Sequence, residues 1–219
     1  MEQTRKFGYT ELLTAREYNI AIGLYLLFGM TIAGIFTYGA GDVAAPLMAV
    51  HPLAFAIIYL GVMMGVSALA AGTNNGVLAS GFYLLMCATT GVLLSTYVPD
   101  IAMNIVLAAF TGTVGILLIM TLMAGMFPQT FQSLGRTLLA SLLCSIVVEL
   151  VMLLFGLSTG FMDFIVLGIF SLYIGFDWVK GQERDATLQG AVLTSIELYM
   201  DLLNIFVRLL SIMGKSKKN

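Results

Sequence analysis

Long apolar stretches follow one another along almost the whole chain, and they constrain its fold more than any other feature. A helix needs about 20 apolar residues to cross the roughly 30 Å hydrocarbon core of a bilayer. Short breaks rich in Gly, Pro, Asn and Asp separate the stretches, and they leave no room for an extramembrane domain. The sequence therefore predicts one all-α domain over residues 1–219, a polytopic membrane protein that is a bundle of seven transmembrane helices. The seven segments are roughly 19–40, 52–71, 76–97, 101–127, 134–155, 161–179 and 188–212.

The charge content agrees with a chain that is surrounded by lipid. Only 10% of the 219 residues are charged, whereas about a quarter would be expected in a soluble domain. The net charge of −2 offers no basic surface for nucleic acid, so the bilayer is the expected partner. Cys87 and Cys144 lack a CxxC spacing and are expected to be small core residues. With His51 as the single histidine, we expect no transition-metal site and no cofactor.

Arginine and lysine gather on one side of the predicted topology. The first three loops of the opposite side carry neither. The positive-inside rule then predicts a cytoplasmic N-terminus in the cell membrane, plasma or inner. Seven crossings would place Lys215, Lys217 and Lys218 outside, against the rule, and a re-entrant last segment would remove that conflict. The length of the last segment favours a full crossing. The basic residues of the N-terminal side are Arg5, Lys6, Arg16, Arg136, Lys180 and Arg184.

The last segment carries a polar stripe on an otherwise apolar helix. At 100° per residue, its polar side chains share an arc of about 80°. A carboxylate that faces lipid costs about 2.5–3.5 kcal/mol on insertion scales. We therefore expect the stripe to face the interior of the bundle or a water-filled cavity. Its members are Thr194, Glu197, Asp201, Asn204 and Arg208.

Asp177 is a possible partner for the stripe. It lies in the last turns of the sixth segment, beside Trp178, and the short polar loop 180–186 leads from there to the last segment. Two antiparallel helices joined in this way can bring Asp177 and Asp201 side by side, although their registers are offset by a turn or two. Nearby carboxyl groups in a low dielectric resist joint ionisation and tend to share a proton.

Glu149 and Arg208 leave two interpretations open. Glu149, the acidic residue of the fifth segment, either pairs with Arg208 and lines a cavity, or is protonated and hydrogen bonds to the backbone. Glu197 likewise either lines a pathway or simply forms an ion pair with Arg208 or with a neighbouring helix. Arg208 lies close enough to the helix end to reach the interface.

The last segment resembles the Bax inhibitor-1 (transmembrane Bax-inhibitor-motif) family, of the bacterial type. The last helix of that family carries Leu-Tyr-Leu-Asp-x-x-Asn-Leu-Phe-x-x-Leu-Leu, and its sixth helix ends in a Tyr-Asp-like motif that Asp177 matches. The stretches 82–95 and 108–120 are similar to the third and fourth family helices. The matching residues of the last segment are Leu198, Tyr199, Asp201, Asn204, Phe206, Leu209 and Leu210.

The resemblance implies a function as well as a fold. It implies a seven-helix bundle with a central last helix, and a non-enzymatic, pH-sensitive calcium leak in which Asp177 and Asp201 sense protons at the gate. Calcium would be the transported ion, bound transiently by the two carboxylates, because it prefers hard oxygen ligands. Glu197, Asn204, Glu149 and Arg208 would line the pathway, and we expect the protein to be monomeric.

The chain departs from the family pattern at two places. Phe176 stands where the sixth-helix motif has Tyr, followed by Trp178-Val179 in place of the usual pair. Bacterial relatives can carry basic residues at the end of the second helix that reach the aspartates, and 67–76 contains none here. The sequence therefore does not identify a residue that would lock the channel in a closed state.

Two other functional classes compete with a leak. One is a membrane scaffold that regulates a protein partner without transporting ions, which measurements of flux into liposomes would separate. The other is an intramembrane aspartyl protease, which also needs two aspartates on adjacent helices. This chain has no proline after Pro128 and so lacks the later Pro-Ala-Leu motif of such enzymes.

Overall fold

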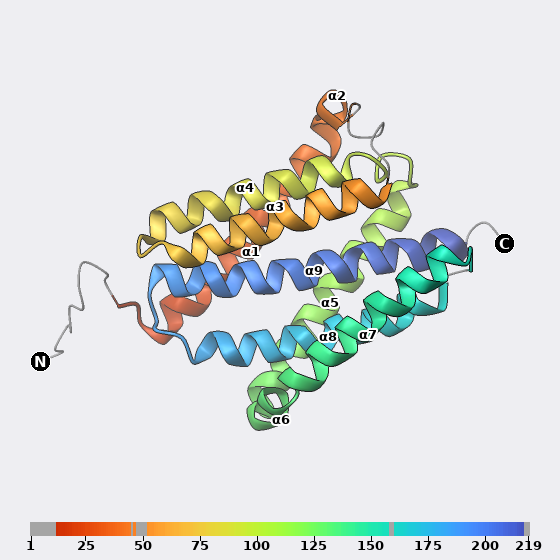
Figure 1. Ribbon diagram of the computed structural model, residues 1–219. Coiled ribbons are helices and arrows are strands. Elements are labelled where there is room, and N and C mark those ends of the chain that lie inside the picture. The colour runs from red at the N-terminus through yellow and green to blue at the C-terminus, as the bar shows by residue number, and fades with distance from the viewer. Residues whose placement is uncertain (1–11, 45, 47–51, 158–159, 217–219) are drawn as a thin grey trace, which may run out of the picture. The chain divides into compact units, whose positions relative to one another are not determined.

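The computed structural model describes residues 12–44, 46, 52–157 and 160–216. Within these ranges the regular secondary structure is helical (Figure 1). Each predicted segment corresponds to a long helix whose ends differ from the prediction by a few residues. The helices are α1 (Ala15–Gly39), α2 (Gly41–Ala44), α3 (Pro52–Gly72), α4 (Gly76–Leu94), α5 (Met103–Met126), α6 (Pro128–Ser133), α7 (Gly135–Leu154), α8 (Gly160–Gln182) and α9 (Leu188–Ser216).

Several of these helices have the length and composition of membrane spans. Among the described residues, α1, α4, α5, α7 and α8 meet both conditions, and the Tyr59–Gly72 part of α3 is a shorter apolar helix. The protein is therefore a multi-pass helical membrane protein. The α9 helix is 29 residues long, but Glu197, Asp201, Arg208 and Lys215 interrupt its apolar surface. The crossing of α9, and with it the count of seven, stays a prediction.

The helices form two compact units, which share α9. The first comprises residues 1–100 and 184–196, and the second comprises residues 101–183 and 197–219. In the first unit, α4 packs against both α1 and α3. Gly29 of α1 allows a close approach, because a Cβ atom there would overlap the Tyr83 hydroxyl group of α4. That hydroxyl donates a 2.7 Å hydrogen bond to the Tyr25 carbonyl oxygen, and the two rings meet edge to face.

In the second unit, α8 packs against α5, α6 and α7. Pro128 occupies the first turn of α6, where its missing N–H costs nothing. Phe131 of α6 then reaches Gly175 of α8, where a side chain would overlap its ring. Ala124, Phe131 and Val179 form a buried cluster that Trp178 partly covers. This packing fixes the last turns of α8, which carry Asp177.

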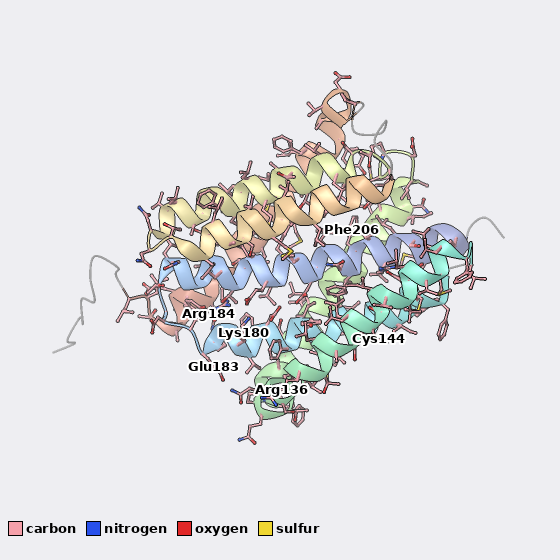
Figure 2. The ribbon with its side chains drawn as sticks, in the orientation of Figure 1. Arg136, Cys144, Lys180, Glu183, Arg184 and Phe206 are labelled. Atoms are coloured by element: carbon pink, nitrogen blue, oxygen red, sulfur yellow. The ribbon has the colours of Figure 1, made fainter. Side chains whose placement is uncertain are left out.

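The two cysteines, both predicted to lie in the core, differ in how far they are buried. Cys87 is buried, as expected, whereas Cys144 is exposed on α7 (Figure 2), so the prediction that it belongs to the core is wrong. Only Leu138 and Ser145 are buried on α7, because α7 turns most of its circumference outward within its unit. The charged residues Arg5, Lys6, Lys217 and Lys218, on which the predicted orientation depends, and His51 lie outside the described residues.

Candidate functional site

The predicted aspartate pair is formed by α8 and α9 within the second unit. Asp177 is 8% exposed and Asp201 is 4% exposed. Their carboxyl groups lie close enough for each to influence the charge of the other. Two neighbouring carboxyl groups in a low dielectric resist joint ionisation and tend to share a proton. The structure therefore brings together the two carboxyl groups that the sequence left offset by a turn or two.

One oxygen of this pair is left without a hydrogen bond. Asp201 Oδ2 is buried and has no hydrogen-bond partner among the described residues. A buried acceptor of this kind is costly unless a proton, a water molecule or a cation satisfies it. Chemically, the pair can thus take up a proton or offer oxygen ligands to a hard cation.

Three further groups act on the aspartate pair. Lys180, at the end of α8 (Figure 2), donates to Glu197 Oε1 at 2.8 Å. Both ends of this ion pair interact electrostatically with Asp201. The Tyr173 side chain, one turn before Asp177, interacts with both aspartates. Glu197 therefore pairs with a residue of α8 and belongs to the surroundings of the aspartate pair.

The other members of the stripe have separate partners. Asn204 donates through Nδ2 to the Met200 carbonyl oxygen of its own helix at 2.8 Å. Thr194, which belongs to the first unit, lies 3.0 Å from the Tyr18 hydroxyl group and receives a 3.0 Å hydrogen bond from Arg184. Both side chains are therefore satisfied within the protein.

Arg208 is bound by two carboxylates in the second unit. It contacts Glu149 of α7 through two nitrogens, Nη1 to Oε1 at 2.6 Å and Nη2 to Oε2 at 2.9 Å. Its Nη1 also donates to Asp163 Oδ1 at 2.9 Å. The proposed pairing of Glu149 with Arg208 is therefore present. Asp201 is two turns away from Arg208 on the same helix, about 10 Å along the axis.

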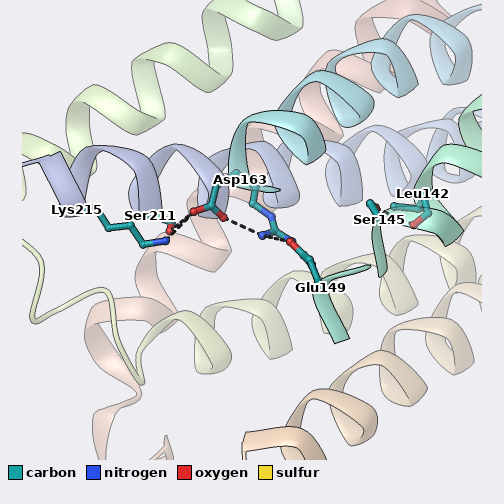
Figure 3. Close-up of polar contacts among 7 residues, drawn as sticks. Leu142, Ser145, Glu149, Asp163, Ser211 and Lys215 are labelled. Carbon is teal, nitrogen blue, oxygen red and sulfur yellow. Dashed lines mark hydrogen bonds and ion pairs between the residues drawn. The ribbon is translucent and has the colours of Figure 1, made fainter. Parts of the chain in front are cut away.

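Asp163, in the first turn of α8, is the centre of this second cluster (Figure 3). It is 3% exposed. Its Oδ2 accepts hydrogen bonds from Ser211 at 2.7 Å and from Lys215 at 2.9 Å. A buried carboxylate is stable only when it is paired and hydrogen bonded, and here both oxygens are satisfied.

Sequence reasoning missed Asp163, Lys180, Ser211 and Lys215 as members of these clusters. A signal for two of them was present. Ser211 and Lys215 extend the stripe of α9 by one and two turns beyond Arg208, at the helical spacing of its other members. Asp163 gave a weaker signal, as an acidic residue within an apolar segment.

The fold and the site define a multi-pass helical membrane protein whose last two helices bury a pair of carboxyl groups. Residues 17–218 match the family described as "Inhibitor of apoptosis-promoting Bax1". The chain belongs to this Bax inhibitor-1 family.

A curated relative supports the same assignment. The protein "Bax inhibitor 1" of Schizosaccharomyces pombe (strain 972 / ATCC 24843) is 30% identical over 142 residues, which cover 63% of this chain and 53% of the relative. The match thus spans about half of the relative's length. An inhibitory action on Bax belongs to the name of that relative and not to this chain.

Proposed function

We propose that this protein is a pH-sensitive calcium leak, in which Asp177 and Asp201 serve as proton sensor and transient cation site. The observation that carries the proposal is the proximity of the two buried carboxyl groups. When protonated, the pair offers fewer anionic oxygens to a cation. When ionised, it offers hard ligands that suit calcium but are too few to hold it tightly. One motif would then sense pH and bind the passing ion.

Lys180 takes a specific part in this proposal. Relatives can carry a basic residue on the second helix, and residues 67–76 lack one here. Lys180 supplies a positive charge to the same carboxyl groups from α8, through its contact with Glu197 and its interaction with Asp201. Its side chain is 46% exposed, so it is free to swing into solvent when a cation arrives. We assign it the role of a tethered cation that competes with calcium.

The surroundings of the protein are part of the proposal. We expect a monomer in the cell membrane with a cytoplasmic N-terminus, no cofactor, no nucleic-acid partner and no catalytic activity. Glu149, Asn204 and Arg208 would lie along the same path as the aspartate pair, because they share its stripe or bind to it.

Flux into liposomes tests the proposal. Purified protein is reconstituted around a calcium indicator, and calcium entry is followed over a series of pH values. We expect entry above that of protein-free liposomes, with a pH dependence that Asp177→Asn/Asp201→Asn removes. Entry no faster than in protein-free liposomes would reject the leak and favour the regulator class, to which the name of the yeast relative points.

A further inference from the structure

The cluster of Glu149, Asp163, Arg208, Ser211 and Lys215, hereafter the Asp163 cluster, lies apart from the aspartate pair that forms the proposed ion site. Asp163 and Asp177 are four turns apart on α8, about 20 Å at 1.5 Å per residue. On α9, Arg208 lies two turns beyond Asp201. The Asp163 cluster and the aspartate pair therefore lie at successive positions along the same two helices, within the same unit.

The Asp163 cluster fixes where α9 lies along α8. Both oxygens of the buried Asp163 side chain are bound by α9, through Arg208, Ser211 and Lys215. The three α9 residues span two turns of one face, so a slip of α9 by even one turn would break every one of these contacts. It would also leave a buried carboxylate without partners, which is strongly unfavourable.

Glu149 makes this attachment more rigid. The guanidinium group of Arg208 is held by α7 through the two-point contact with Glu149 and by α8 through Asp163. A planar, bidentate guanidinium contact fixes orientation as well as distance. On the other side of the aspartate pair, the Lys180–Glu197 contact also joins α8 to α9. The contact between Asp177 and Asp201 lies between these two attachments.

We propose that Arg208, acting through Asp163 and Glu149, is a positioning residue that sets the register of α9 on α8 and thereby holds Asp177 and Asp201 in contact. Arg208 contacts neither Asp177 nor Asp201, and its effect reaches these two residues through the rigid α9 helix. This positioning role adds to the proposed calcium leak. It depends on that leak only for the flux measurement. When Arg208 is neutralised, α9 gains freedom to shift and the two carboxyl groups separate.

The test needs a signal that does not depend on transport, and Trp178 provides one. It is the only tryptophan of the chain and follows Asp177 directly. Its emission over a pH series reports ionisation beside it in purified protein, and calcium flux into liposomes gives a second midpoint. The charges that face the pair are those of Glu197 and Lys180, with Tyr173 beside them, and the variants leave all three in place.

The variants are Arg208→Gln and Asp163→Asn, with Arg136→Gln as the matched control. Arg136 is an exposed cation on α7, the helix of Glu149, and belongs to neither cluster. Separated carboxyl groups no longer share a proton. We therefore expect both midpoints to move to lower pH by about one unit, a tenfold change in proton affinity. Arg136→Gln should keep the midpoints of the parent protein.

Two milder variants keep the test decisive if the neutral ones fail to fold. Arg208→Lys retains the charge but lacks the fork that binds two carboxylates, and Ser211→Ala removes one hydrogen bond from Asp163. Both milder variants should shift the Trp178 midpoint to lower pH, by less than Arg208→Gln and Asp163→Asn do. A folded Arg208→Gln or Asp163→Asn protein with the parent midpoint overturns the proposal, as do parent midpoints in both milder variants.

The two proposals fail in different ways. If the parent protein shows no calcium flux, the leak is rejected while the Trp178 titration still tests the positioning role. If flux is present and responds to Asp177→Asn, but no Asp163-cluster variant moves either midpoint, the positioning role is rejected and the leak stands.

Discussion

Glu149 on α7 and Arg208 on α9 form a two-point ion pair, with Nη1 2.6 Å from Oε1 and Nη2 2.9 Å from Oε2. The same guanidinium group also neutralises Asp163, which is almost fully buried. One arginine therefore balances carboxylates from two neighbouring helices. Its loss would remove the ion-pair partner of Glu149 and would leave Asp163 with Lys215 and Ser211 alone.

Arg208→Leu should accordingly destabilise the protein far more than Lys215→Gln. We expect a loss of about 3 kcal/mol, the lower end of the range for a broken buried pair, because Arg208 is still 23% exposed. Lys215 is 56% exposed, so solvent weakens its contact with Asp163, and we expect a loss of about 1 kcal/mol or less. Thermal unfolding in detergent measures both changes. Equal losses would contradict the conclusion that Arg208 is the main ion-pair partner in the Asp163 cluster.

Close packing in the first unit gives a second prediction about stability. Gly29→Ala places a Cβ atom against the Tyr83 hydroxyl group, which must then give up its hydrogen bond to the Tyr25 carbonyl oxygen. We expect a loss of about 1–3 kcal/mol from overpacking. Gly23→Ala is the control on the same helix, since its Cβ would have no neighbour within 4 Å, and it should be neutral or slightly stabilising. A similar effect of both variants on thermal unfolding would argue against this packing of α1 on α4.

Lys180 and Glu197 should shift the pH response of the flux in opposite directions. A nearby positive charge favours the ionised form of a carboxyl group, and a nearby negative charge favours the protonated form. Lys180→Gln should therefore move the flux midpoint to higher pH, and Glu197→Gln should move it to lower pH. Each shift should be less than about one unit, because both side chains are partly exposed to solvent. Shifts of the same sign would show that these groups act on the flux by some other route.

The topology is testable with single cysteines in a protein that lacks Cys87 and Cys144. A cysteine at Asp185, in the connection between α8 and α9, should react with a membrane-impermeant thiol reagent only after permeabilisation. A cysteine at Ser216, at the end of α9, should react in intact cells. The predicted orientation places the first site inside and a crossing α9 places the second outside. Labelling of both only after permeabilisation would mean that α9 does not cross.

The presence of each long helix could be predicted from the sequence, because a long apolar run in a membrane has few possible structures other than a helix. Helix ends were less accessible. The α4 helix ends at Leu94, before the predicted 97, because the backbone N–H groups of Thr96 and Tyr97 bond to carbonyl oxygens three residues back instead of four. The α9 helix continues past Gly214 to Ser216, since Lys215 gains a carboxylate partner in Asp163.

The two halves of the candidate site differed in how well the sequence revealed them. Asp177 and Asp201 could be paired because a short loop forces α8 and α9 to lie antiparallel. Asp163 could not be assigned to Arg208, because that contact depends on how α8 and α9 pack over four further turns. Glu149 was proposed as a partner of Arg208, but a protonated carboxyl group was equally compatible with the sequence. The two-point contact between Glu149 and Arg208 depends on how α7 packs, which the sequence does not show.

The central claim is that Asp177 and Asp201 act as one proton-sensing unit in a calcium leak. A double-mutant cycle tests it most directly, with calcium flux into liposomes followed over a pH series for Asp177→Asn, Asp201→Asn and the double variant. The account predicts that each single variant shifts or removes the parent pH midpoint, and that the double variant adds little to either one, because removing one carboxyl group already dissolves the unit. Single variants that both keep the parent midpoint, with effects on flux that simply add in the double variant, would contradict it.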